Sequence, residues 1–244
     1  MQSVKLAILV LLFSAFSLAS IARVQHTSVI NQNCSPTCTL SISSTGSGHL
    51  LVLVYATGYS PGTSISSVTG GGTWVASGAC VSQDTTGGSG IDIAYVLSSS
   101  SGTTSLSITV SHSDTLAAFA FAEYSGGTAS LDGSCQTISN QSASTHPLSA
   151  AITTAGTNDL IVTGVEQTGF HYGTTTVTNQ QGTGWTTPIV ELNGVLGFDD
   201  DLNVSASTYQ ASFTGSGSYT YCSSTFAFTF SSGSSSIKHR GQIL

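Results

Sequence analysis

The fold is decided by the stretch HLLVLV at residues 49–54, which is echoed by NDLIV at residues 158–162. A tryptophan follows each stretch, Trp74 in the first case and Trp185 in the second, and each tryptophan comes after a Gly/Thr-rich run. Short apolar runs bounded by turn-forming residues are typical of buried β-strands. The repetition therefore predicts two related sets of strands that build one structure.

Alternating apolar and polar residues extend this pattern along the chain, from a first predicted strand at residues 39–43 to a last one at residues 224–230. Glycine-rich breaks, such as those at residues 70–72 and 215–217, separate the strands. Many short strands with Gly/Ser turns favour an all-β fold, an antiparallel β-sandwich or jelly roll built from two related halves.

No charged or proline-rich linker divides the two halves. We therefore predict a single β-sandwich domain over residues 23–231, with a pseudo-repeat of 39–125 and 148–231. Residues 125–147 are predicted to form a crossover loop between the halves. The Ser-rich and then basic tail at 232–244 lacks apolar periodicity and is predicted to be flexible.

The first 22 residues have the pattern of a signal peptide. Lys5 precedes an apolar run from Leu6 to Phe16, and Ser20 and Ala22 occupy the small-residue positions that signal peptidase requires. We place the cut after Ala22 and predict a secreted, extracellular or cell-envelope protein. The apolar run is short for a membrane span, so no span is predicted after cleavage.

Charge is sparse and mostly negative. Charged residues make up 6% of the chain, and the formal net charge is −7. A body with so few cations is not expected to bind nucleic acid or anionic lipid.

Five cysteines are present in a chain that we predict to be exported, so disulfides are expected. Cys34 and Cys38 are predicted to form a local disulfide, because the intervening Ser-Pro-Thr can turn the chain back. Cys80 is expected to pair with either Cys135 or Cys222, and the sequence leaves this choice open.

Five short motifs carry a resemblance to a known group of proteins: GHLLV at 48–52, SVTGGGTW at 67–74, GIDIAY at 90–95, AEYSG at 122–126 and NDLIV at 158–162. Together they resemble secreted bacterial Ser/Thr/Gly-rich β-sandwich proteins of soil-type bacteria, whose function is unsettled. The resemblance implies an extracellular sandwich and transfers no catalytic residue.

Two glutamates occupy positions inside predicted strands. Glu123 shares a strand face with Phe119 and Phe121, and Glu166 shares one with Leu160 and Val162. Two carboxylates facing each other across a concave sheet would match the acid/base and nucleophile pair of a glycoside hydrolase. The alternative is that both glutamates lie at strand ends, solvated or hydrogen-bonded to neighbouring Tyr or Ser side chains.

Asp199, Asp200 and Asp201 form the densest run of charge in the chain. Adjacent carboxylates in a loop can bind Ca²⁺, which takes several oxygen ligands in irregular geometry. The run is therefore a candidate calcium site, weighed against a solvated acidic loop, and no other cofactor is predicted.

Phe170, His171 and Tyr172 form the best candidate for an exposed aromatic platform that stacks against sugar rings. The leading functional prediction is a noncatalytic, secreted or cell-surface module that binds polysaccharide or a cell-surface glycan. The first alternative is a carbohydrate-active enzyme that uses Glu123 and Glu166. The second is a self-assembling extracellular structural protein, which would form oligomers.

Overall fold

A computed structural model describes residues 20–57, 62–76, 78–85, 88–167, 177–181, 185, 189–192, 196–215 and 217–232. Within these ranges the protein is all-β, and the strands form antiparallel sheets. The predicted fold class is confirmed. No helix of the described residues is long and apolar enough to cross a membrane.

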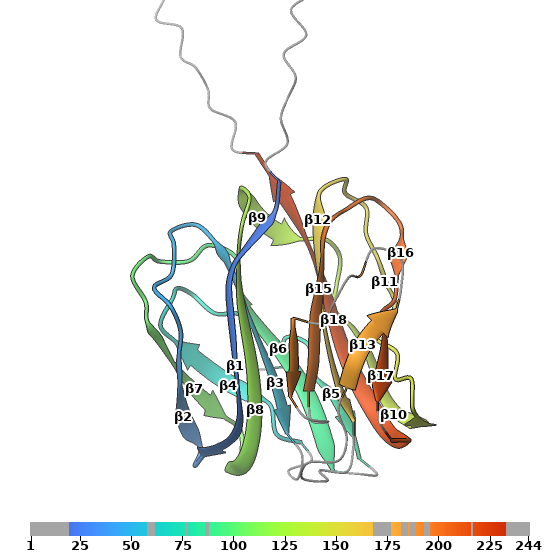
Figure 1. Cartoon of the computed structure of the whole chain (residues 1–244). Helices are drawn as coiled ribbons and strands as arrows, with labels where there is room; N and C mark the ends of the chain where they lie inside the picture. Colours follow the sequence, from blue (N-terminus) through green and yellow to red (C-terminus); the bar gives the residue numbers. More distant parts are fainter. Residues whose placement is uncertain are drawn as a thin grey trace, which may run out of the picture.

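The first half of the chain builds two sheets (Figure 1). The first central sheet has the order β1 (Ala22–Cys34), β8 (Asp114–Ser125), β3 (Leu50–Thr57), β6 (Ser89–Val96) and β5 (Ser82–Asp84). The first outer sheet has the order β2 (Thr37–Ser41), β7 (Ser105–Val110) and β4 (Ile65–Thr69).

The second half builds an equivalent set. The second central sheet has the order β10 (Gln136–Ser144), β18 (Tyr219–Ser231), β12 (Asp159–Gln167), β15 (Leu196–Val204) and β14 (Val190–Leu192), and β9 (Thr128–Leu131) also pairs with β18. The outer strands form two pairs, β11 (Ile152–Thr153) with β16 (Thr208–Tyr209), and β13 (Val177–Gln181) with β17 (Ser212–Gly215).

The strand order of the two halves is the same. The strands are counted from β1 in the first half and from β10 in the second, with β16 and β17 taken as one interrupted strand. Both central sheets then have the order first, eighth, third, sixth and fifth strand. In the outer sheets, β11 corresponds to β2 and β13 corresponds to β4. The strand that corresponds to β7 is interrupted, and its two parts are β16 and β17. The repetition therefore begins at β1 and β10, upstream of the repeat boundaries predicted from the sequence.

The sheets stack in layers that enclose three hydrophobic cores. The two central sheets lie face to face around the central core, which contains Val52, Tyr95 and Phe226. Each central sheet also packs against its own outer strands, around cores that contain Phe119 in the first half and Phe213 in the second. Strand β1 lies against β14, and β10 lies against β5, so the halves meet in a reciprocal arrangement.

The aromatic residues of the last strand of each half point into different cores. Phe119 and Phe121 of β8 face the outer core of the first half, whereas Phe226 and Phe228 of β18 face the central core. Alanines of β8 occupy the central-core face of the first half. Because side chains alternate between faces along a strand, a shift of one residue between the repeats moves the whole aromatic set to the other face.

Two disulfides are present among the described residues. The predicted disulfide between Cys34 and Cys38 closes the turn between β1 and β2. The second joins Cys80 to Cys135, so Cys222 is a free, buried thiol. Cys80 precedes β5 and Cys135 precedes β10, and this disulfide therefore connects the two halves.

The folded body begins before the predicted signal-peptide cut. Ile21 is 2% exposed and belongs to the central core. Its backbone N–H donates to Oδ1 of Asn203 at 2.7 Å, and its carbonyl accepts from Nδ2 of Asn203 at 3.1 Å. A cut after Ala22 would remove these contacts.

Candidate functional site

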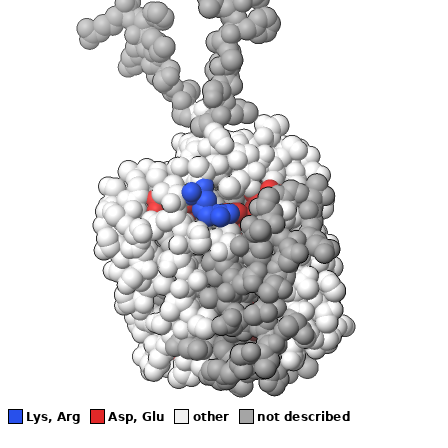
Figure 2. Space-filling model, in the orientation of Figure 1, with Lys and Arg blue, Asp and Glu red and all other residues white. Residues whose placement is uncertain are grey.

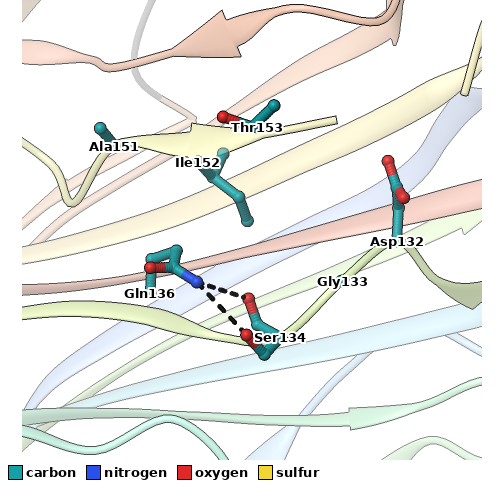
Figure 3. A pocket seen from close by; sticks show the side chains of 7 residues that line it. All are labelled: Asp132, Gly133, Ser134, Gln136, Ala151, Ile152 and Thr153. Atoms are coloured by element: carbon teal, nitrogen blue, oxygen red, sulfur yellow. Dashed lines mark hydrogen bonds between the residues drawn. The ribbon is translucent and has the colours of Figure 1, made fainter. Parts of the chain in front are cut away.

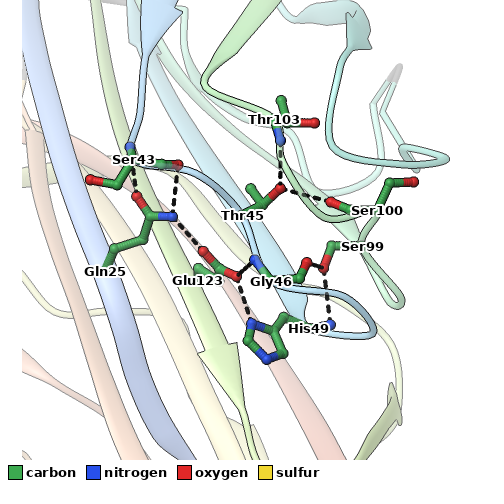
Figure 4. Close-up of polar contacts among 9 residues, drawn as sticks. All are labelled: Gln25, Ser43, Thr45, Gly46, His49, Ser99, Ser100, Thr103 and Glu123. Carbon is green, nitrogen blue, oxygen red and sulfur yellow. Dashed lines mark hydrogen bonds and ion pairs between the residues drawn. The ribbon is translucent and has the colours of Figure 1, made fainter.

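Glu123 lies at the centre of a buried polar cluster between β1, β8 and the segment before β3 (Figure 4). Its carboxylate accepts from Gly46 N at 2.7 Å and from Nε2 of Gln25, and His49 Nδ1 lies 2.6 Å from its Oε1. The side-chain amide of Gln25 also binds the backbone of Ser43: its Nε2 donates to Ser43 O, and its Oε1 accepts from Ser43 N. The carboxylate is fully buried and its donors come from this chain, so its role is to fix the ends of three segments.

Glu166 lies in a different space. It points into the interface between the two central sheets, where its Oε2 is 3.7 Å from Sγ of Cys222. Burial raises its pKa well above the usual value, and the charge of Asp84 raises it further. Glu123 shares its face with the outer core of the first half instead, because it is opposite Leu51 in the sheet. The structure therefore does not bring the predicted catalytic pair together.

Asp199, Asp200 and Asp201 lie within β15, and the expectation of an acidic loop is wrong. Asp200 points toward the first central sheet, where it accepts from Arg23 Nε at 2.8 Å and from Nη2 of the same side chain. Asp199 and Asp201 point to the opposite face of the sheet, since successive side chains of a strand alternate. Three carboxylates divided between two faces cannot chelate one ion, and no described group of three ligating residues has metal-binding geometry.

Burial shifts the pKa of Asp199 and of Asp201, the two aspartates that face away from the first central sheet. It raises the pKa of Asp199 to about 9 and that of Asp201 to about 6, and the charge of Asp200 contributes to both shifts. In the described part of the face drawn in Figure 2, most side chains are neither acidic nor basic, and the one basic area is bordered by acidic atoms.

The structure describes the two tryptophans but not the three residues of the predicted aromatic platform. Phe170, His171 and Tyr172 lie outside the described residues. Trp185 is 7% exposed and belongs to the outer core of the second half, and Trp74 packs against the outer core of the first half. The repeated tryptophans are thus equivalent packing residues of the two outer cores.

A pocket of about 290 Å³ lies between the segment that connects β9 to β10 and the short strand β11 (Figure 3). It is lined by Asp132, Gly133, Ser134, Gln136, Ala151, Ile152 and Thr153. This volume lies at the lower end of the range of small-molecule sites, which starts at about 300 Å³. Asp132, Gly133 and Ser134 lie in the segment between β9 and β10, whereas Gln136 begins β10 and Ile152 belongs to β11.

The lining of the pocket is mainly polar. Ile152, which is 3% exposed, projects into the space between Gln136 and Asp132. Thr153 points away and its hydroxyl lies 2.8 Å from that of Thr208. The side chains that present polar atoms to the pocket are therefore those of Asp132, Ser134 and Gln136.

A second carboxyl group lies behind Asp132. Asp159 is fully buried, and its Oδ2 accepts from Gly156 N at 2.9 Å. Burial raises the pKa of Asp159, and the adjacent Asp132 carboxyl raises it further. Asp132 is held in place by Ala155 N, which donates to its Oδ2 at 2.7 Å. The arrangement keeps the pocket-lining carboxyl group fixed.

Sequence reasoning missed every residue of this pocket. Asp132, Ser134 and Gln136 fall in the segment interpreted as a crossover loop, and Ile152 belongs to a strand of two residues. The one available signal was Asp132-Gly133-Ser134, a turn sequence with a carboxylate beside a disulfide cysteine.

Comparisons with known proteins do not assign the chain to a family. No family model matches it, and no curated protein matches it. Among solved structures, it is similar to a chain of "Life in the extremes: atomic structure of Sulfolobus Turreted Icosahedral Virus", with 9% identity, a TM-score of 0.26, and coverage of 86% of this chain and 90% of that one.

Two further solved structures are similar to the chain at comparable sequence identity and TM-score. One is described as "Crystal structure of PBSX exported protein XepA", with 10% identity, a TM-score of 0.23, and coverage of 82% and 86% of the two chains. The other is "Crystal Structure of the STIV MCP", with 10% identity, a TM-score of 0.26, and coverage of 84% and 97%. TM-scores of this size carry no information about what this chain does.

Proposed function

We propose that the protein is a secreted or cell-surface, noncatalytic module that binds a glycan through the pocket between the β9–β10 segment and β11. The observation that carries the proposal is the lining of that pocket. Asp132, Ser134 and Gln136 offer polar atoms to the hydroxyl groups of a sugar.

The placement of the carboxyl groups supports binding over hydrolysis. A glycosidase needs two carboxyl groups about 5–9.5 Å apart on either side of the scissile bond. Glu123 and Glu166 face different inter-sheet spaces, and both are fully buried. Asp159, the carboxyl group next to Asp132, is fully buried and does not line the pocket.

A matched pair of variants tests the proposal. Gln136 lines the pocket and its Nε2 donates to Ser134 O at 3.2 Å, whereas Gln141 donates to Ser139 O at 2.9 Å on the same strand, away from the pocket. We expect a glycan array and saturation-transfer NMR to detect binding by the wild type and by Gln141→Ala, and a loss of binding for Gln136→Ala. A blank array and flat NMR spectra at high protein concentration would refute the proposal.

One observation favours a second candidate, a self-assembling structural protein. Strand β1 is 13 residues long and lies at the edge of the first central sheet in the described structure. Its only Lys or Arg side chain, Arg23, is bound to Asp200, and Val24 is 48% exposed. Long edges with few charges can pair with a second chain. Light scattering coupled to size-exclusion chromatography tests this candidate, and a monomer at all concentrations would rule it out.

A further inference from the structure

We infer that the pocket selects sugars that are neutral or carry an amine, and that it rejects sugars that carry a carboxylate or sulfate. This inference rests on the proposed function, because it concerns the same pocket, and it adds the chemical class of the ligand.

The first step concerns Asp132. A carboxylate offers about four acceptor positions. The described contacts of Asp132 are a hydrogen bond from Ala155 N at 2.7 Å and the interaction with Asp159. Acceptor positions therefore remain for a ligand, and a carboxylate offers no donor when it is ionised.

The second step concerns Gln136. Its Nε2 donates to Ser134 O at 3.2 Å and to Ser134 Oγ at 3.3 Å, which occupies both amide hydrogens. The only polar atom of this amide group without a described partner is its oxygen, which is an acceptor. The hydroxyl of Ser134 is the one rotatable donor among the pocket-facing side chains.

The third step concerns charge. Arg23 is the only Lys or Arg within the described residues, and it is bound to Asp200 of β15. No described cation lines the pocket, whereas Asp132 does. A ligand carboxylate or sulfate would bring a like charge next to Asp132, which disfavours binding. A protonated amine would instead gain a charge-assisted hydrogen bond.

These three steps define a pocket that needs donors from its ligand. Neutral sugars supply hydroxyl donors, and amino sugars supply an ammonium group. Asp159 is fully buried and does not line the pocket, and Ala155 N holds Asp132 in place.

The experiment uses matched sugars in the gluco, galacto and manno series. Each series contains the neutral methyl glycoside, the 2-amino sugar and the uronic acid, and binding to the full chain is measured by saturation-transfer NMR and calorimetry at fixed ionic strength. We expect the amino sugar of at least one series to bind best, and the uronic acid of that series to bind about tenfold or more weakly than the neutral sugar.

The variant Asp132→Asn keeps the shape of the side chain and removes its charge. We expect it to abolish the preference for the amino sugar and to bring the uronic acid close to the neutral sugar, whereas Gln141→Ala retains the wild-type order. Equal wild-type affinities within every series, or an unchanged order in Asp132→Asn, would overturn the inference and leave the proposed function standing. Failure of all nine sugars to bind would count against both, and Gln136→Ala on a polysaccharide array would then decide the proposed function separately.

Discussion

Removing the disulfide between Cys80 and Cys135 should destabilise the protein far more than removing the one between Cys34 and Cys38. The first disulfide closes a loop with a sequence separation of 55, and the second closes one with a separation of 4. In the chain-entropy model, the cost of removing a cross-link rises with the logarithm of loop length. The model gives about 4 kcal/mol for the long loop and about 2 kcal/mol for the short one.

Two double variants form a matched comparison, Cys80→Ala with Cys135→Ala, and Cys34→Ala with Cys38→Ala. Each replaces two half-cystines, at least one of them buried. Urea denaturation measures the free energy of unfolding, and thermal scans should show a decrease in Tm of roughly 8–16 °C for the long-loop variant. An equal or larger loss for the short-loop variant would refute the reasoning.

The same long-loop variant reports on the pocket. Cys135 lies between Ser134 and Gln136, so the disulfide anchors the wall that carries both side chains. We expect glycan affinity to decrease in the long-loop variant at urea concentrations where both variants are folded. The short-loop variant serves as the control, because its disulfide closes a distant turn.

Three further changes have defined expected outcomes. Gly164→Ala would place a Cβ atom 2.4 Å from the nearest side-chain atom of the opposite central sheet, so we expect a loss of about 1–3 kcal/mol in urea denaturation; wild-type stability would show that the sheets can separate without cost. Burial raises the pKa of Asp199 from 3.8 to about 9, so the folded state binds a proton that the unfolded state releases. Stability should therefore fall between about pH 4 and 9, by up to about 1.4 kcal/mol per pH unit for this group, and the slope should flatten in Asp199→Asn; an equal slope in both proteins would show that the side chain ionises freely. A protein that starts at Ser20 should be more stable than one that starts at Arg23 by about 2 kcal/mol in the same assay, because only the longer chain buries Ile21; equal stabilities would show that the predicted cut is structurally harmless.

The sequence predicted the central strands well because burial on both faces leaves a clear apolar signal. Residues 50–57 and 159–167 form β3 and β12, as the opening motifs predicted. The edge strands β1 and β10 were missed, since most of their residues are polar and few are fully buried. Edge strands bury little apolar surface, so periodicity does not mark them.

The candidate site was harder to predict, for a reason that the three aspartates of β15 illustrate. Adjacent acidic residues normally indicate a solvated loop, and here Asp200 is retained inside the protein by Arg23, which lies far away in the sequence. Only the stacking of two sheets brings that partner into place. The pocket depends in the same way on contacts between segments that are separate in the sequence, such as Asp132 with Ala155.

The duplication itself indicates where function should be sought. Repeated strands with the same order are explained by the requirements of packing, because each half must bury both faces of its central sheet. The segment between β9 and β10 lies before the second repeat begins, and it carries Asp132, Ser134 and a half-cystine that fixes it to the other half. A segment that lies outside the repeat, is anchored by a disulfide and forms a polar concave wall is not required by the fold. Asp132 and Ser134 are therefore the residues of this segment whose substitution should alter binding while leaving the sandwich intact, whereas Cys135 also stabilises the fold.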